Sequence, residues 1–526
     1  MENIINDDLV DEKVYLWLND QVVVSCLMQE DMLHSEMEGD WDELLKESDG
    51  KKVYLFGAGK MTRQYIDRIK KKVKIEYIID NDSKRNGENL SGCIICTPDK
   101  LFQEKNGDCI VIIASTIYAT TIYKQLVNNG ITRIYSLLNL LKKEEDFRVK
   151  IDKCREYLKN IPINRNKILV KLKPKGRYAG NAKIIVEELV KINPNCEIVW
   201  MSELGEKVPK YIKKVASSQQ NLLYELASAS VFIYNDIQHF GIPKKDGQLF
   251  INTWHGCVAL KHIGKYINNA SVDVGLELMH INGTSEKTDY YISNGTWCTG
   301  MYRDSFNYSG EILEVGSPRL DPLFENKSDD EKTIRSELGI ANNKRILLYA
   351  PTFRQCSRTN GSEVIEFNIL NMKSALEERF GGEWEIVVKM HPAVKLSETV
   401  KRRLKNAIWI ETEKDIYEIL KITEVLMTDY SSTMFEVGFL KRKVILFATD
   451  VETYLKYERG MYFDFFNLPY PIALSEGELL EVIRNFDENK YLRDVEKFNK
   501  DELGIVEDGT AGRKVAQIIN LYIKGE

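Results

Sequence analysis

Residues 425–440 have the sequence VLMTDYSSTMFEVGFL, and this stretch decides the fold. Residues 425–428 form an apolar run of the length of a buried strand, and residues 433–440 continue as a helical segment. The polar residues 429–432 stand between them. A strand that passes through a short polar turn into a helix is the unit of a doubly wound parallel sheet. In such sheets ligands bind beyond the carboxyl ends of the strands, so the turn 429–432 is a candidate site.

The same alternation of strands and helices recurs along the chain, in three blocks at about 51–145, 165–320 and 340–526. No period of 20–50 residues repeats, which excludes a solenoid. Two adjacent doubly wound domains with a cleft between them form the GT-B arrangement. We therefore predict an α/β protein with a GT-B-like pair and an extra N-terminal Rossmann-like domain. The predicted domains are 1–148, 149–325 (acceptor side) and 326–526 (nucleotide-donor side), with a charged helical linker near 142–155.

Composition narrows the class of protein. The chain has 526 residues, 43% of them hydrophobic, and its 73 basic and 79 acidic residues give a net charge of -6, which argues against a nucleic-acid binder. No apolar run approaches the ~18 residues of a membrane span, and the acidic N-terminus lacks a secretion signal. The odd number of cysteines, nine, suggests reduced thiols, and the CxxC at 93–96 lacks partners for a zinc site. We expect a cytoplasmic protein that requires no cofactor. The sequence predicts no metal site and does not specify whether the activity depends on a metal.

Five segments place polar residues where predicted strands end or turn. They are, in chain order, NTWHGCVALKHIG at 252–264, VGSPRLD at 315–321, YAPTFR at 349–354, VKMHP at 388–392 and MTDYSS at 427–432.

Together these segments resemble those of the CDP-glycerol glycerophosphotransferase family, the teichoic acid polymerases and primases, over roughly residues 165–510. The resemblance implies transfer of an alditol phosphate, most readily glycerol phosphate, from CDP-glycerol or CDP-ribitol to an acceptor hydroxyl, with release of CMP. The implied product is a teichoic-acid-like or capsular polymer, and the implied acceptor is a polymer or a lipid-linked chain. The implied location is cytoplasmic or peripheral, at the inner face of the membrane.

Two histidines are the catalytic candidates. His255 precedes a glycine, so its ring can approach a ligand closely, and we predict that it is the base that deprotonates the acceptor. The alternative is a structural histidine packed on Trp254. His391 follows a predicted strand and can donate to a phosphoryl or leaving-group oxygen. The alternative is a histidine that caps the strand end.

Six residues are candidates for the donor diphosphate. Ser431 and Ser432 stand where a helix begins, and its unpaired N–H groups favour an anion there; the alternative is an ordinary N-cap. Guanidinium groups pair with phosphate oxygens, so arginines are further candidates, with surface salt bridges as the alternative. The full predicted set is Arg319, Arg354, Thr428, Ser431, Ser432 and Lys389.

The resemblance also implies nucleotide contacts from Pro351 and Thr352. Glu436, one helical turn after Ser432, can reach a ribose hydroxyl or can lie on a solvated helix face. A basic stretch at 395–405 can touch an anionic membrane or be a solvated helix face.

The N-terminal block resembles half of a nucleotide-binding Rossmann domain. Gly57 and Gly59 match two glycines of the GxGxxG pattern, Thr62 replaces the third, and Asp80 follows at the distance of a ribose-binding carboxylate. The alternative is that the turn and the acidic strand end only serve the fold. Two other functions stay open: a GT-B nucleotide-sugar glycosyltransferase, and an N-terminal NAD(H) oxidoreductase or docking module. The sequence specifies neither the alditol nor the oligomeric state.

Overall fold

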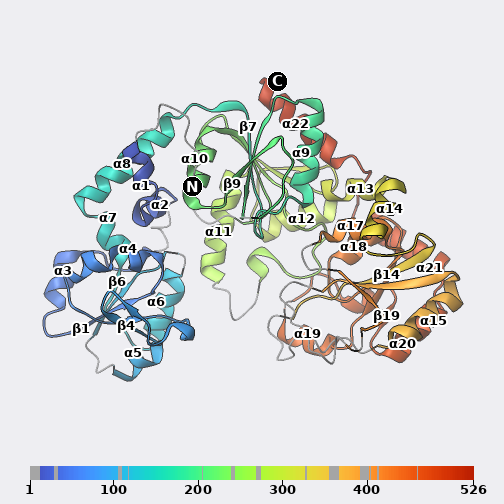
Figure 1. Ribbon diagram of the computed structural model, residues 1–526, viewed down its shortest axis with the longest axis horizontal. Helices are drawn as coiled ribbons and strands as arrows, with labels where there is room; N and C mark the ends of the chain where they lie inside the picture. The colour runs from blue at the N-terminus through green and yellow to red at the C-terminus, as the bar shows by residue number, and fades with distance from the viewer. Residues whose placement is uncertain are drawn as a thin grey trace. The chain divides into compact units, whose positions relative to one another are not determined.

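Three β-sheets organise the chain in the computed structural model (Figure 1). The structure describes residues 12–28, 34–104, 109–116, 118–203, 205–237, 243–267, 274–325, 328–354, 367–390, 402, 404–410, 414–458 and 460–526. The chain folds as two compact units. The first comprises Met1–Asn164, Val215–Ala229 and Ile237–Gln248, and the second comprises Arg165–Lys214, Ser230–Asp236 and Leu249–Glu526.

The first unit contains a six-stranded sheet with the order β3-β4-β2-β1-β5-β6. It is parallel except for the short antiparallel pair of β3 and β4. Its strands are β1 (Lys52–Phe56), β2 (Ile75–Ile79), β3 (Asn89–Leu90), β4 (Cys93–Cys96), β5 (Cys109–Ile113) and β6 (Ile134–Ser136). The helices of this unit are α1 (Glu12–Trp17), α2 (Gln21–Leu27), α3 (Trp41–Glu47), α4 (Lys60–Lys70), α5 (Pro98–Glu104), α6 (Ala119–Asn128), α7 (Leu137–Lys142), α8 (Glu145–Asn160) and α10 (Gln219–Ser228).

The second sheet has seven strands in the order β13-β12-β11-β10-β7-β8-β9. They are β7 (Asn164–Lys171), β8 (Glu197–Ser202), β9 (Ile212–Ala216), β10 (Ala229–Tyr234), β11 (Leu249–Asn252), β12 (Tyr290–Ser293) and β13 (Glu311–Glu314). The nearby helices are α9 (Gly180–Ile192), α11 (Val274–Lys287), α12 (Thr296–Ser305) and, at the end of the chain, α22 (Ala511–Lys524).

The third sheet has six strands in the order β16-β15-β14-β17-β18-β19, all paired in parallel. They are β14 (Lys344–Tyr349), β15 (Glu383–Val388), β16 (Ile408–Trp409), β17 (Val425–Thr428), β18 (Lys443–Phe447) and β19 (Ile472–Ala473). Its helices are α13 (Asp321–Phe324), α14 (Ser328–Glu337), α15 (Ile369–Phe380), α17 (Ile416–Ile422), α18 (Thr433–Phe439), α19 (Val451–Tyr457), α20 (Glu476–Arg484) and α21 (Glu488–Lys497).

The stretch 425–440 folds as predicted. β17 occupies residues 425–428, all of them buried, and α18 begins at Thr433 after the polar turn. The predicted α/β class, with its parallel sheets, is confirmed. The charged segment near 142–155 is helical, and α8 buries Phe147 and Leu158 in the first unit.

The last helix of the chain joins the second sheet. Val515, Ala516 and Ile519 of α22 belong to the same core as Ile185 of α9 and Ile233 of β10. Figure 1 shows α22, in red, beside α9. The domains predicted from the sequence, divided at residue 325, place residues 511–524 with the third sheet instead. Amphipathic periodicity marks such a segment as a helix but does not show which sheet it packs against. The three domain boundaries stay predictions.

No helix among the described residues combines the length and apolarity needed to cross a bilayer.

Candidate active site

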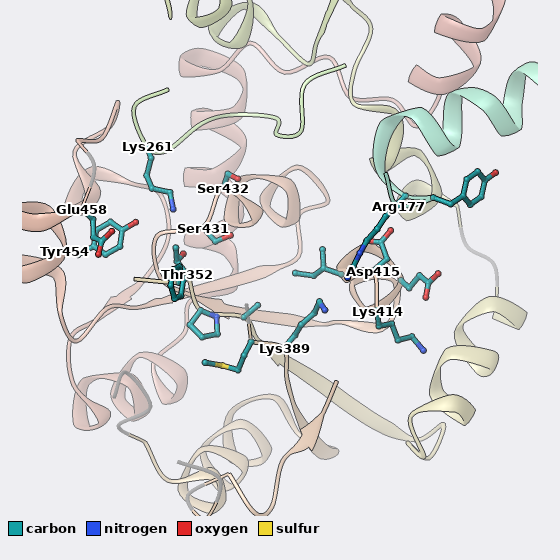
Figure 2. Close-up of a pocket in the computed structure, with 18 of the residues that line it drawn as sticks. Arg177, Lys261, Thr352, Lys389, Lys414, Asp415, Ser431, Ser432, Tyr454 and Glu458 are labelled. Atoms are coloured by element: carbon teal, nitrogen blue, oxygen red, sulfur yellow. The ribbon is translucent and has the colours of Figure 1, made fainter. Parts of the chain in front are cut away.

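A cavity of about 770 Å³ opens in the second unit, at the carboxyl ends of β14, β15 and β17 (Figure 2). Three lysines, Lys261, Lys389 and Lys414, line it, as do the hydroxyl groups of Thr352, Ser431 and Ser432. The remaining lining residues are Arg177, Tyr178, Ala179, Glu206, Ala350, Pro351, Phe353, Met390, Asp415, Ile416, Glu418, Tyr454 and Glu458. The cavity therefore offers both cations and hydroxyl donors to a ligand.

The structure brings together five of the residues predicted to contact the donor, because Pro351, Thr352, Lys389, Ser431 and Ser432 all line this cavity. They come from three separate segments that meet where parallel strands end. In Figure 2, Thr352 and Ser431 lie near each other, and Lys389 lies along the same wall.

Thr428 lies beneath the cavity and does not line it. Its side chain is fully buried, and its hydroxyl donates to the Ala350 carbonyl at 2.7 Å. Thr428 thus joins the end of β17 to the end of β14. Its predicted contact with the diphosphate stays a prediction.

Arg354 is buried below the same loops. Its Nη2 lies 2.8 Å from Asp429 Oδ2 and its Nε lies 2.7 Å from Asp450 Oδ2. The guanidinium also lies 4.9 Å from the ring centroids of both Tyr430 and Tyr454. Burial opposes the charge, but the two carboxylates outweigh it and raise the pKa of Arg354 above its ordinary value. A phosphate contact from Arg354 would have to compete with these two carboxylates.

Asp429 organises the two loops that carry the lining hydroxyls. Its Oδ1 accepts from the backbone N–H of Thr352 at 2.8 Å and from that of Tyr430 at 2.6 Å. Its other oxygen faces Arg354. One buried carboxylate therefore fixes Thr352 and the start of the 430–432 turn relative to each other.

His255 lies in the turn after β11. It directly follows Trp254, whose backbone is in the left-handed region with φ 49°. The Trp254 and His255 rings are 4.1 Å apart between centroids, so the packing on Trp254 that was the alternative role is present. His255 Nδ1 lies 3.0 Å from the Asn235 carbonyl oxygen, to which it can only donate. In the neutral ring this bond leaves Nε2 with its lone pair.

The surroundings of His255 favour a neutral ring. Desolvation by the protein around it lowers the pKa of His255, against the opposing effects of the Asn235 hydrogen bond and the nearby Asp236 carboxylate. The Asn235 side chain is held in turn by Lys173, whose backbone N–H and C=O it contacts at 2.8 and 2.9 Å. His255 itself is exposed to solvent, and it is not among the residues that line the cavity.

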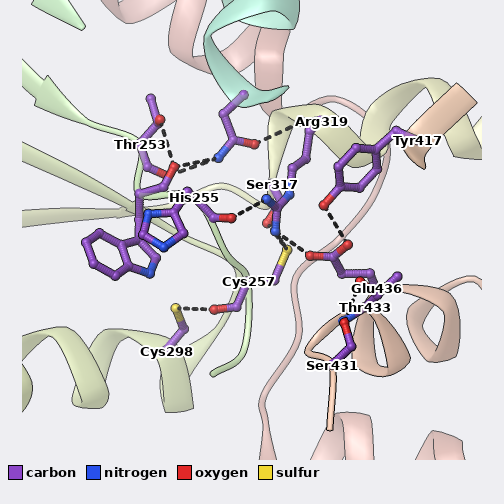
Figure 3. Close-up of polar contacts among 12 residues, drawn as sticks. Thr253, His255, Cys257, Cys298, Ser317, Arg319, Tyr417, Ser431, Thr433 and Glu436 are labelled. Atoms are coloured by element: carbon purple, nitrogen blue, oxygen red, sulfur yellow. Dashed lines mark hydrogen bonds and ion pairs between the residues drawn. The ribbon is translucent and has the colours of Figure 1, made fainter. Parts of the chain in front are cut away.

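Arg319 and Glu436 form a buried ion pair (Figure 3). Their side chains are 8% and 2% exposed, and Glu436 Oε2 also accepts from the Tyr417 hydroxyl at 2.7 Å. Neither residue lines the cavity. The predicted contacts of Arg319 with phosphate and of Glu436 with ribose would require this pair to open.

His391 lies outside the described residues, as does most of the basic stretch at 395–405. Their predicted roles are therefore predictions still. Neighbouring Lys389 is described, and desolvation lowers its pKa, against the attraction of Asp415.

Arg177 is a lining residue that the sequence analysis missed. It follows Gly176, which has φ 63° and packs so closely that a Cβ atom there would lie 2.0 Å from the Met201 carbonyl oxygen. The Trp200 Nε1–H donates to the Gly176 carbonyl at 2.8 Å. The polar, glycine-containing segment after β7 was the available signal, because it also follows the end of a buried strand. Lys261 and Asp415 were likewise not assigned a role.

In the first unit, Asp80 contacts its own glycine turn. Its Oδ2 accepts from the Ala58 N–H at 2.7 Å, and Arg85 Nη1 lies 3.4 Å from the same oxygen. Gly57 adopts φ 106°, and Gly59 is the N-cap of α4. The structure thus brings Asp80 to the turn, and the contact serves the fold directly. A nucleotide at Gly57, Gly59 and Asp80 stays a prediction.

Among the described residues, no cluster of three or more histidine, cysteine, aspartate or glutamate side chains is arranged to hold a metal ion.

Parallel sheets joined by helices, with a cavity beyond the strand ends, define an α/β protein of the GT-B type. Residues 155–521 match the family described as CDP-Glycerol:Poly(glycerophosphate) glycerophosphotransferase, and the chain belongs to this family of enzymes. Residues 49–134 match the family described as C2185-like, N-terminal. The resemblance inferred from the five segments is confirmed.

The chain is 27% identical over 450 residues to the teichoic acid poly(glycerol phosphate) polymerase of Staphylococcus epidermidis, covering 79% of this chain and 61% of the relative. It is 26% identical over 388 residues to the polymerase of the same name from Bacillus subtilis, covering 70% and 50%. The chain thus spans only about half to three fifths of these relatives. Transferases of ribitol phosphate also match, at 25% identity.

The wall teichoic acid polymerase TagF has a similar fold. One of its crystal structures superposes with a TM-score of 0.61 at 26% identity, covering 73% of this chain and 95% of that one. A histidine-to-asparagine variant of TagF soaked with CDPG superposes equally well. These matches confirm the predicted GT-B-like fold.

Proposed function

We propose that this enzyme transfers an alditol phosphate, glycerol phosphate in the first instance, from a CDP-linked donor to an acceptor hydroxyl and releases CMP. One observation carries the proposal: residues of four separate family segments, including Lys261, Thr352, Lys389 and Ser431, line one cavity at the strand ends. Membership of the glycerophosphotransferase family supports the chemistry.

The lining suits a diphosphate. Ammonium groups and hydroxyls are donors to phosphate oxygens, and the cavity presents Lys261, Lys389, Ser431 and Ser432. Lys389 is partly desolvated, which strengthens its attraction for an anion. The donor would place its diphosphate among these groups.

His255 acts as the base in this proposal. Its Nδ1–H is held by the Asn235 carbonyl, so Nε2 is the atom that accepts a proton. Nε2 takes the proton of the acceptor hydroxyl as the acceptor oxygen bonds to the β-phosphorus of the donor. The bond from that phosphorus to the bridging oxygen breaks, and CMP leaves with the electron pair. The lowered pKa keeps the ring neutral and able to accept a proton near neutral pH.

The protein contributes mainly position and charge in this reaction, since phosphoryl transfer needs little covalent chemistry from the enzyme. His391, outside the described residues, is proposed to hold the diphosphate or the leaving oxygen. The product would be a teichoic-acid-like or capsular polymer, built on a polymer or lipid-linked acceptor at the inner membrane surface. No resident cofactor or metal is part of the proposal.

A donor panel tests the function. The full-length protein is incubated with CDP-glycerol, CDP-ribitol, UDP-glucose and GDP-mannose and a short polyol-phosphate acceptor, and the released nucleotide is identified. CMP from a CDP-alditol is expected, and an inactive His255→Gln variant is the control. Release of UDP or GDP with no CMP would contradict the proposal and favour a nucleotide-sugar glycosyltransferase.

A further inference from the structure

The ion pair of Arg319 and Glu436 joins two distant parts of the second unit. Arg319 lies in a short 3-10 turn, Pro318–Leu320, soon after β13, whereas Glu436 lies in α18 beside the third sheet. Both side chains are almost fully buried. The pair therefore links the end of the second sheet to the helix that follows the lining residues Ser431 and Ser432.

On one side, Arg319 holds the turn that carries His255. Its Nη1 donates to the His255 carbonyl oxygen at 2.6 Å, and its Nη2 lies 3.4 Å from Cys257 Sγ. Its backbone N–H donates to Asn181 Oδ1 at 3.1 Å, while Asn181 Nδ2 donates to the Thr253 carbonyl at 3.0 Å. The main chain on both sides of the His255 ring is thus fixed through one residue, as Figure 3 shows.

On the other side, Glu436 belongs to the helix that directly follows the donor-side loop. It lies on the first turn of α18, which begins one residue after Ser432. Ser431 Oγ accepts from the Thr433 N–H at 3.3 Å and contacts the Thr433 hydroxyl at 3.0 Å. The Tyr417 hydroxyl donates to the free oxygen of Glu436, and its ring lies 5.1 Å from the Arg319 guanidinium carbon.

Stability alone does not explain a buried ion pair at this place. Desolvation of two charges offsets most of their attraction, and apolar residues of equal volume commonly serve a fold as well. Here Arg319 also contacts the turn of the base, and Glu436 is part of the helix that follows the donor loop. A need to keep the His255 turn and the donor loop at a fixed distance and orientation accounts for the position of both charged residues.

We propose that Arg319 and Glu436 are positioning residues that set the base His255 relative to the donor-binding turn 429–432. The inference rests on the proposed function, because it concerns the geometry between the proposed base and the proposed donor site. Small displacements of a reacting group cost large factors in rate without weakening substrate binding. Disturbing the pair should therefore separate kcat from donor affinity.

Kinetics test this first. Arg319→Lys and Glu436→Gln should each lower kcat for CMP release by about 10-fold or more, with the dissociation constant of CDP changed less than about threefold. The double variant Arg319→Gln/Glu436→Gln, which removes both charges together, should lose less than the product of the losses measured in the single variants Arg319→Gln and Glu436→Gln. The matched control is the ion pair of Arg345 and Glu424, away from the cavity, in the variants Arg345→Lys and Glu424→Gln.

A titration gives a second, activity-independent readout. His255 is observed by NMR in protein labelled at histidine, and its signal among the six histidines is assigned with His255→Gln. The charged groups that face it are Asp236, Arg319 and Lys173. Because Arg319 lowers the pKa of His255, Arg319→Gln should raise that pKa, whereas Glu436→Gln, which unmasks the guanidinium, should lower it.

The outcomes are distinct. Unchanged kcat in both single variants, or a fall in kcat matched by the control pair, overturns the inference, as does a loss of CDP affinity as large as the loss of rate. Circular dichroism and urea unfolding show whether each variant folds. If a single variant misfolds, the kinetics of the double variant, which leaves no unpaired buried charge, are used in its place. If the wild-type protein releases CMP from no donor, the proposed function fails by itself. The histidine titration then decides, because shifts in the same direction, or none, contradict the coupling.

Discussion

Arg354 Nη2 lies 2.8 Å from Asp429 Oδ2, and both side chains are completely shielded from solvent. The two residues are 75 positions apart in the chain. Asp429 also receives the Thr352 N–H, so this single contact ties the YAPTFR loop to the TDYSS turn. The hydroxyls that face the cavity depend on a charge pair hidden below them.

Asp429→Asn should therefore lower both stability and donor binding. The amide oxygen can still accept from Thr352, but Arg354 loses the fully buried one of its two carboxylate partners. Breaking a buried pair typically costs about 3–5 kcal/mol; since Asp450 remains, we expect the lower part of that range. Urea unfolding gives the stability, and calorimetric titration with CDP gives the affinity. Wild-type values for both would show that Asp450 alone organises the loops.

His255→Ala is expected to lower transfer by about 10²- to 10⁴-fold, the usual contribution of a general base. Affinity for CDP should stay near the wild-type value, because His255 does not line the cavity. The measurement is CMP release from CDP-glycerol beside a CDP titration. His262→Ala, on the same segment, is the matched control, and a His255→Ala variant that keeps most of its turnover would identify another base.

The double variant Ser431→Ala/Ser432→Ala should mainly weaken donor binding, in contrast to His255→Ala, which should mainly lower the rate of transfer. Both residues line the cavity, so losing their hydroxyls removes donors to the diphosphate and should raise the dissociation constant of CDP. Hydrogen bonds to a charged group contribute about 1.5–3 kcal/mol each, so the loss of two corresponds to a more than roughly 100-fold weaker affinity. Calorimetry decides between this role and a purely structural turn, for which the affinity would not change.

Glu507 should make stability fall as pH rises. Burial raises the pKa of Glu507 from 4.5 to about 7, although the Ser317 N–H, 3.0 Å from both carboxylate oxygens, opposes the rise. The folded state thus binds a proton that the unfolded state has released between these values. The resulting stability is complete below about pH 4.5 and is lost as pH rises through 7, with a size on the order of 3 kcal/mol.

Glu507→Gln tests this linkage, because the amide imitates the protonated acid. Urea unfolding from pH 5 to 8 should show a flatter profile in the variant than in the wild type. Asp321, whose pKa burial raises to about 6, contributes a slope of the same sign and persists in the variant. An unchanged profile would mean that Glu507 titrates near its ordinary value in the folded protein.

Deleting residues 1–145 should leave a folded protein that still releases CMP. All described lining residues of the cavity belong to the second unit, and the described part of the first unit supplies none of them. The deletion removes α1 and α2, which pack on α8, so exposed apolar surface on α8 should reduce solubility. CMP release by the fragment, with circular dichroism as the check on folding, is the measurement. A folded but inactive fragment would show that the first unit completes the active site.

Local pattern was enough to predict several features of this protein. The strand at 425–428 and the polar turn after it could be predicted from consecutive residues. The burial of a strand and the start of a helix depend mainly on residues that are neighbours in the chain. Pro351, Thr352, Ser431 and Ser432 could be assigned to one site because parallel strands end at a common edge.

The destination of long charged side chains could not be predicted in this way. Arg319 and Arg354 both follow strand ends, and both were expected at the phosphate, yet each is buried against carboxylates. A guanidinium pairs equally well with a phosphate or a carboxylate, so residue type does not separate the two. Glu436 lies on the buried side of α18, where its partner comes from a segment 117 residues away.

By itself, then, the sequence determined the α/β class, the family and the edge of the sheet at which a ligand would bind, since each depends on short runs of residues. Only the tertiary structure decided that Arg177 enters the cavity, that α22 completes the core of the second sheet, and that Arg319 joins the His255 turn to α18. These relationships depend on which surfaces pack together across hundreds of residues. A charged side chain that is buried loses its contacts with water, so it must pair with a polar or oppositely charged group in the protein interior.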